Sequence, residues 1–276
     1  MRDIQYIFLW QLVPRFWKRF LLARLYRFYF YISRSIFALI NFDTTHSDPE
    51  KQNVHHWLLP SSIRAIICGP SSCGKTNLLM NLLLNQGTDG QSLLNYQKVY
   101  IYSTSLDQDK YRFLKEFAEA LKANLGQTIF EFCSSSETII PVEKLMTTQA
   151  NPPRTLLIFD DCMLEKQEPI EKYFSQGRHG NADCFYLCQS FYKIPKTVIR
   201  ENANLLVLFR QDMRNLRQLY DAYVTCDMPF KEFLSFIEHC WNKSDYSFAV
   251  LDLTSAADCG RYRCGFDEIY VPNWII

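Results

Sequence analysis

The sequence lacks the features that define membrane-spanning, secreted and repeat proteins. Even in the aromatic-rich first 42 residues, no uncharged run approaches the roughly 18 residues that cross a bilayer. No plausible secretory signal is present, so we expect a protein that is not secreted. No internal repeat is visible either. A composition that is 48% hydrophobic over 276 residues is ample for a large buried core.

The ten cysteines do not form a pattern that predicts disulfides or zinc. The spacings Cys184-x3-Cys188 and Cys259-x4-Cys264 are poor zinc signatures, and His239-Cys240 has no obvious partner pair in the sequence. Several cysteines, Cys68 among them, lie in apolar runs. We therefore expect reduced, buried thiols and no metal site held by cysteines.

Charge is nearly balanced overall but unevenly distributed. Residues 1–42 hold seven Lys or Arg and a single acid, which leaves 23 basic and 28 acidic groups in the remainder. A protein that coats nucleic acid with its whole surface would be basic. Any DNA contact of this mildly acidic body is therefore expected to be local, such as a loop repeated around a ring.

The most informative segment is GPSSCGKT, residues 69–76, which matches the phosphate-binding loop Gly-x4-Gly-Lys-Thr. An apolar run precedes it and a Leu-rich run without breakers follows, which predicts a strand, a tight loop and a helix. Gly69 and Gly74 allow the backbone N–H groups to converge on phosphates. We expect Lys75 to contact the β and γ phosphates of ATP and Thr76 to ligate Mg²⁺. The predicted ATP-binding loop is completed by Pro70, Ser71, Ser72 and Cys73.

A second motif is the apolar run of residues 155–159, which leads into Asp160 and Asp161. A continuous apolar run is typical of a strand buried on both faces of a parallel sheet, and ligands gather at the carboxyl ends of such strands. We therefore predict a Walker B strand. Asp160 is expected to support Mg²⁺, and Asp161 to orient or deprotonate the attacking water.

Strand and helix patterns alternate along the rest of the chain and predict a parallel α/β sheet with right-handed crossovers. The apolar strand after Walker B ends at Gln189, the expected position of a γ-phosphate sensor. Residues 248–253 and 268–271 are expected to form a C-terminal β-hairpin. The predicted organisation is a basic aromatic extension (1–42), a linker (43–54) and a P-loop ATPase domain (55–276).

The role of residues 1–42 stays open at this stage. A basic, aromatic and amphipathic segment can bind an anionic membrane or an acidic partner. Two other interpretations are helices that dock on the body of the protein and an extension from a misassigned start codon.

With these motifs in order, the chain resembles the DNA-packaging ATPases of the FtsK/HerA superfamily. The resemblance is to the type encoded by large double-stranded DNA viruses, virophages, adintoviruses and Maverick/Polinton elements. It covers roughly residues 55–271, and its most specific segment is YLCQSFYKIPKTVIRENANLLVLFRQ, residues 186–211. The phosphate loop, the acidic strand end and residues 177–179 also match.

The resemblance implies a RecA-like core of the additional-strand type, assembled as a hexameric ring that hydrolyses ATP to drive double-stranded DNA into a capsid. By position it assigns phosphate and metal contacts to Lys75, Thr76 and Asp160, the base to Asp161 and the sensor to Gln189. Many relatives have Glu where this chain has Asp161, although similar viral ATPases also show paired Asp. Capsid proteins are the implied partners, at sites of virion assembly in the host nucleus or cytoplasm.

A ring ATPase also needs an arginine finger from the neighbouring subunit, because charge develops on the transferred phosphoryl group. Arg178, in a polar loop after Walker B, is the first candidate, followed by Arg200 and Arg210. Lys193 and Lys196 are candidates for contact with DNA phosphates or are ordinary surface lysines.

Two other functions remain open: a cellular FtsK/HerA-type DNA pump or helicase, and a non-hydrolysing relic that only binds nucleotide. We also expect Cys73 to be accessible enough for thiol reagents to block nucleotide binding.

Overall fold

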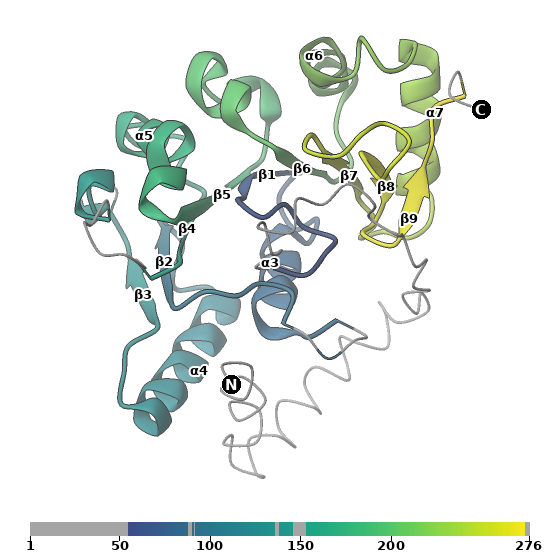
Figure 1. The fold of residues 1–276 in the computed structure, drawn as a ribbon. Helices are drawn as coiled ribbons and strands as arrows, with labels where there is room; N and C mark the ends of the chain where they lie inside the picture. The colour runs from purple at the N-terminus through teal and green to yellow at the C-terminus, as the bar shows by residue number, and fades with distance from the viewer. Residues whose placement is uncertain (1–54, 88–89, 91, 136–137, 146–152, 274–276) are drawn as a thin grey trace.

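A nine-stranded sheet runs through the part of the chain that the structure describes (Figure 1). This computed structural model describes residues 55–87, 90, 92–135, 138–145 and 153–273. The extension and linker predicted for residues 1–54 lie outside that part.

Six strands of the sheet pair in parallel, and the central ones are apolar runs buried on both faces, as is typical of parallel sheets. Every residue is buried in the Walker B strand (Thr155–Asp160) and in the strand beside it (Ala182–Cys188). In spatial order the parallel strands are β3 (Phe130–Cys133), β2 (Lys98–Ser103), β4 (Thr155–Asp160), β5 (Ala182–Cys188), β1 (Arg64–Cys68) and β6 (Leu205–Leu208).

One strand, β5, separates the strand before the phosphate loop from the Walker B strand. It pairs with β1 from Arg64↔Cys184 to Cys68↔Cys188 on one side, and with β4 on the other. This is the arrangement of the additional-strand class of P-loop proteins, and the predicted fold class is confirmed.

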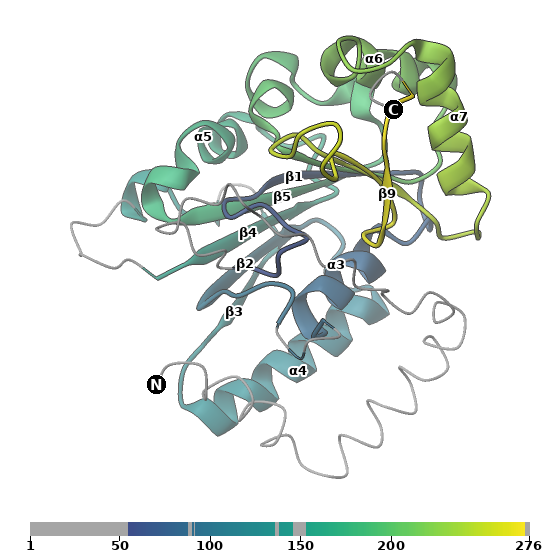
Figure 2. The ribbon, with the colours of Figure 1, turned by 45° about the vertical axis from the view of Figure 1, so that its right-hand side comes forward.

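Helices cover both faces of the sheet (Figures 1 and 2). Successive strand residues point to opposite faces, so Ile67 and Ile158 face one core while Ile66 and Leu157 face the other. The first core is closed by α3 (Lys75–Leu84) and α4 (Asp109–Leu125), and the second by α5 (Glu168–Gln176), α6 (Met213–Tyr223) and α7 (Phe230–Trp241).

The C-terminal region forms an antiparallel hairpin, but the expected pairing of residues 248–253 with residues 268–271 is wrong. Between β7 (Ala249–Asp252) and β9 (Glu268–Tyr270) lies an additional short strand, β8 (Tyr262–Cys264), which pairs with both in antiparallel fashion. β7 itself pairs antiparallel with β6 and so extends the main sheet. The sheet is therefore mixed, with three antiparallel strands at one edge.

Four short helical turns complete the connections: η2 (Val142–Lys144), η3 (Gly177–Gly180), η4 (Phe191–Lys193) and η5 (Lys196–Arg200). None of the helices in the described ranges is long and apolar enough to cross a membrane.

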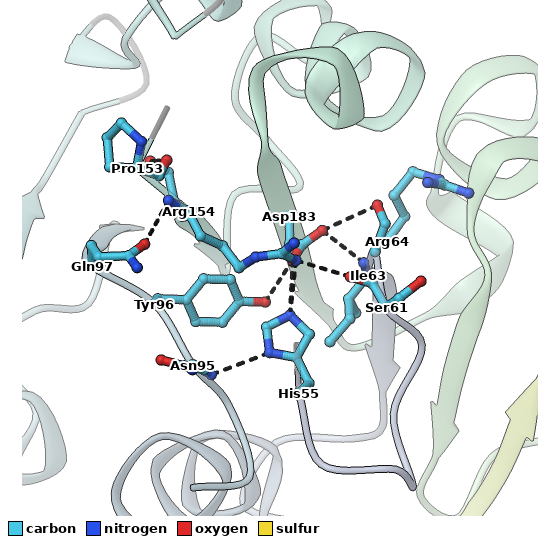
Figure 3. A network of polar contacts seen from close by, with 12 residues as sticks. His55, Ser61, Ile63, Arg64, Asn95, Tyr96, Gln97, Pro153, Arg154 and Asp183 are labelled. Atoms are coloured by element: carbon cyan, nitrogen blue, oxygen red, sulfur yellow. Dashed lines mark hydrogen bonds and ion pairs between the residues drawn. The ribbon is translucent and has the colours of Figure 1, made fainter. Parts of the chain in front are cut away.

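A buried polar network holds the sheet together at the amino ends of its parallel strands (Figure 3). Its centre is Asp183, 2% exposed, near the start of β5. The Oδ1 atom accepts hydrogen bonds from the backbone N–H of Ile63 at 2.8 Å and from the Ser62 hydroxyl at 3.2 Å. The Oδ2 atom contacts the Tyr96 hydroxyl at 3.0 Å and His55 Nε2 at 3.2 Å.

Arg154 supplies the compensating charge, with its Nη1 atom 3.4 Å from Asp183 Oδ2 and 2.9 Å from the carbonyl oxygen of Ser61. A buried carboxylate is tolerated only when its lone pairs are satisfied in this way. The network fixes the chain at residues 55–63 against β5.

We expect Asp183→Ala to destabilise the fold by about 3–5 kcal/mol, because it leaves Arg154 and several buried donors without an acceptor. The check is the free energy of unfolding in urea. The matched control is Asp109→Ala, whose carboxylate is 96% exposed and pairs only with the exposed Arg112. Equal stability of the two variants would contradict a structural role of this network.

Candidate nucleotide-binding site

The predicted phosphate loop forms a tight turn between β1 and α3. Ser72 and Gly74 both have left-handed backbone conformations, with φ of 62° and 110°. A Cβ on Gly69 would lie 2.5 Å from Cys73 Sγ and 2.6 Å from Phe209 Cβ. The first glycine is therefore required by close packing, and the second by its backbone angle.

The loop delivers the N-terminus of α3 to the site. Gly74 is the N-cap residue and offers no side chain, and the first turn contains no acidic residue. The first N–H groups of a helix lack intrahelical partners and carry partial positive charge. They are therefore available to an anion such as a phosphate group.

Lys75 lies folded over this loop. Its ammonium donates to the carbonyl oxygens of Gly69 at 2.7 Å and Pro70 at 2.8 Å. The flexible four-carbon stem lets the same ammonium exchange these carbonyls for phosphate oxygens. The cation expected from the motif is thus located inside the loop.

The Walker B aspartate meets the phosphate loop at Thr76. The Thr76 hydroxyl donates to Asp160 Oδ2 at 3.3 Å, and both residues are 8% exposed. Burial raises the pKa of the Asp160 carboxyl, while a hydrogen bond from Tyr111 opposes this shift. Hydroxyl and carboxylate oxygens are the ligands that Mg²⁺ prefers, so this pair fits a magnesium site.

Tyr111, which lies on α4, is a site residue that sequence reasoning missed. It is fully buried and its hydroxyl is bonded to Asp160. No signal in the charged α4 segment indicates this contact, which spans 49 positions in sequence. A second missed residue is Tyr246, whose half-exposed ring lies 3.5 Å from where a Gly74 Cβ would be.

Asp161 and Gln189 lie together at the carboxyl ends of the parallel strands, the end of the sheet that also carries the phosphate loop. The Gln189 amide Nε2 is 3.5 Å from Asp161 Oδ1, and both side chains are exposed. Asp161 has a left-handed backbone with φ of 58°, a conformation that aspartate tolerates better than most non-glycine residues, and it turns the chain out of β4. The predicted base and sensor are neighbours, and their chemical roles stay predictions.

The candidate arginines are not part of this cluster. Arg178 lies in η3, which precedes β5. It is therefore at the amino ends of the parallel strands, whereas the phosphate loop is at their carboxyl ends. Arg200 stacks on Phe191 and donates to Gln218. Arg210 follows β6 on the phosphate-loop side and donates to the carbonyl of Trp241. Since the finger was predicted to act in a neighbouring subunit, its identity stays a prediction.

The Cys73 thiol is partly buried, and its modification by thiol reagents stays a prediction. Burial raises the pKa of this thiol, an effect that Lys75 partly opposes. The thiolate is the reactive form, so at neutral pH this cysteine is a weak nucleophile.

A cluster of ligand-type side chains lies away from this site. His239, Cys264 and Glu268 place ligand atoms within 4.8 Å of one another. The Glu268 carboxylate already accepts hydrogen bonds from His239 at 2.9 Å and from Lys243. The hydrogen bond from Lys243 lowers the pKa of Glu268. The contact between His239 and Glu268 joins α7 to β9.

Fold and site together define a P-loop nucleotide-binding protein of the additional-strand class. The family model described as "Poxvirus A32 protein" matches residues 50–237, and the chain belongs to that family. The predicted resemblance to viral packaging ATPases is confirmed at this level, while the Maverick/Polinton type stays a prediction.

Two comparisons give the range of similarity. The DNA packaging protein OPG160 of Variola virus is 28% identical over 153 residues, which are 53% of this chain and 53% of that protein. The chain thus spans about half the length of the curated relatives it matches. The genome packaging NTPase B204 from Sulfolobus turreted icosahedral virus 2, solved in complex with AMP, has a TM-score of 0.47 at 13% identity and covers 71% of this chain and 95% of that one.

We expect Tyr111→Phe to raise about tenfold the Mg²⁺ concentration at which nucleotide binding is half-maximal, because Asp160 loses the hydrogen bond that orients it. The measurement is a titration of Mg²⁺ against a fluorescent ATP analogue. Tyr173→Phe is the matched control, since it removes another buried hydroxyl, bonded to the Ile140 carbonyl oxygen instead. An unchanged Mg²⁺ titration in Tyr111→Phe would show that the hydroxyl does not support the metal.

We expect iodoacetamide at neutral pH to modify the exposed Cys226 and Cys259 before Cys73. Because burial raises the pKa of Cys73, the rate of its alkylation should keep increasing about tenfold per pH unit above neutral pH, as the thiolate forms. Mass spectrometry of the modified peptides measures the order, and loss of ATP binding should follow Cys73 modification alone. Cys73→Ser should resist the block, and normal ATP binding by protein alkylated at Cys73 would contradict the prediction.

Proposed function

We propose that this protein is the ATPase of a viral or virus-like DNA-packaging motor, which hydrolyses ATP to drive double-stranded DNA into a capsid. Membership of the Poxvirus A32 family supports the assignment, as does the name DNA packaging protein carried by its Variola virus relatives. Because the chain matches only about half of those relatives, the complete activity rests on the site itself.

The observation that carries the proposal is the meeting of Thr76 and Asp160 at 3.3 Å. These residues come from the two motifs that bind phosphate and magnesium, 84 positions apart in sequence. A chance loop of glycine and serine has no reason to lie against a buried carboxylate at the end of a parallel strand.

The chemistry follows from the positions of the side chains. The Thr76 hydroxyl and the Asp160 carboxylate would hold Mg²⁺, which would supply positive charge to the phosphate groups. Lys75 and the N-terminus of α3 bind the phosphate oxygens. Asp161 accepts a proton from the attacking water or orients it, and the Gln189 amide holds that water in line.

The remaining parts of the proposal concern assembly. Six subunits form a ring, in which Arg178 or another arginine of one subunit completes the nucleotide-binding site of its neighbour. Capsid proteins are the partners, and residues 1–42 contact a membrane or a partner. The ring works inside the host cell, where virions assemble.

The test is the ATPase rate of the purified full-length chain with and without linear duplex DNA. We expect duplex DNA to stimulate the rate and Lys75→Ala to abolish it, since the phosphate cation is lost. Asp161→Asn should bind ATP normally while kcat falls about 10²- to 10⁴-fold, because it keeps the shape of the side chain and removes the base.

Nucleotide binding without hydrolysis under all DNA conditions would favour the non-hydrolysing relic. A Lys75→Ala variant as active as the wild type would point to a contaminating ATPase.

A further inference from the structure

The segment that follows the predicted sensor packs directly on helix α6. After Gln189 come Ser190 and the turn η4, which lies against α6. The contact matters because η4 begins only two positions after Gln189. A movement of α6 therefore reaches the sensor through very few bonds.

One side chain joins the two elements. Asn215, in the first turn of α6, is 5% exposed. Its Oδ1 atom accepts from the Ser190 hydroxyl at 3.2 Å and from the Tyr192 backbone N–H at 2.9 Å. Its own backbone N–H donates to Asp212, the N-cap of α6, at 2.8 Å. Asn215 thus fixes the sensor segment to the beginning of the helix.

The outer side of the same junction is basic and aromatic. The Arg214 guanidinium lies 3.7 Å from the centroid of the Tyr192 ring, which is 40% exposed. Lys193 is exposed beside it, and Met213 is 57% exposed. We call this the α6–η4 surface; it consists of Tyr192, Lys193, Met213 and Arg214.

The α6–η4 surface fits a phosphate backbone. A guanidinium stacked on a ring is held in one orientation, and its N–H groups remain directed outward along its edge. Arg, Lys and Tyr side chains are among the groups that contact DNA phosphates. Asp212, next to Met213 in the sequence, is an acid whose carboxylate caps α6 by accepting from the Asn215 backbone N–H.

We propose that the α6–η4 surface binds the phosphate backbone of duplex DNA and that Asn215 transmits this contact to Gln189. DNA bound at Arg214 favours one position of the first turn of α6. Through Asn215 that position sets Ser190 and Tyr192, and with them the Gln189 amide beside Asp161. The inference rests on the proposed packaging function and names where its DNA acts.

The first experiment measures DNA binding by fluorescence anisotropy of a labelled duplex at several salt concentrations. For Arg214→Gln we expect a Kd raised about fivefold to tenfold and a salt slope reduced by about 0.9, the loss of one phosphate contact. Arg112→Gln is the matched control, since it removes an exposed arginine from α4. Its DNA affinity and basal ATPase rate should equal those of the wild type.

The second experiment separates binding from coupling. Asn215→Ala should bind DNA within about twofold of the wild type and lose most of the DNA-stimulated increase in kcat. Ser190→Ala removes one of the two hydrogen bonds without a buried cavity and should lose part of that increase. Unfolding midpoints show whether both variants are folded, and Ser190→Ala keeps the test valid if Asn215→Ala is not.

The outcomes are distinguishable. A wild type that neither binds nor responds to DNA overturns both the packaging function and this inference. A stimulated wild type with Arg214→Gln indistinguishable from Arg112→Gln overturns the DNA surface alone. Loss of oligomer in Arg214→Gln, measured by light scattering, with DNA affinity per subunit unchanged, would identify the surface as a subunit contact instead. Full stimulation in the folded Asn215 and Ser190 variants overturns the coupling.

Discussion

The site depends on the parallel pairing of three strands, β4, β5 and β1. The carboxyl ends of parallel strands meet at the same end of a sheet, and each of these three strands is followed by a segment of the candidate site. The phosphate loop follows β1, Asp161 follows β4 and Gln189 follows β5. A register shift of one residue would turn every side chain of a strand to the other face. The observed register of β4, β5 and β1 therefore places the three segments of the candidate site at one end of the sheet.

The two adjacent aspartates show how one strand end provides two environments. Asp160 is the last residue of β4, buried and bonded to Thr76 and Tyr111. Asp161 turns out of the strand with a left-handed backbone and lies exposed beside Gln189. Neighbouring carboxylates in different surroundings can take different tasks. The change of backbone direction between them separates a buried carboxylate from an exposed one.

Much of this organisation was predictable because it depends on local patterns. The phosphate loop and the Walker B strand each combine an apolar run with a polar end, and the alternation of strands and helices implies parallel pairing. The contact of Tyr111 with Asp160 was not predictable, since it depends on which face of α4 packs on the sheet. Strand β8 was missed because it is only three residues long and contains the buried Arg263, which pairs with Asp252. Asn215 was missed because a polar residue in a first helical turn resembles an ordinary cap.

The Asp183 network also has a consequence for how the sheet would respond to a pulling force. It joins His55 and Ile63 to β5 at the amino ends of the parallel strands, opposite the end that carries the phosphate loop. A force applied to the chain at His55 enters the sheet at the amino ends of the strands and runs along their axes. The hydrogen bonds between β1 and β5 then resist together in shear, whereas a force across the sheet would break them one after another. For the packaging ATPase proposed above, the Asp183 network would anchor the body of the protein in the direction in which a sheet is stiffest.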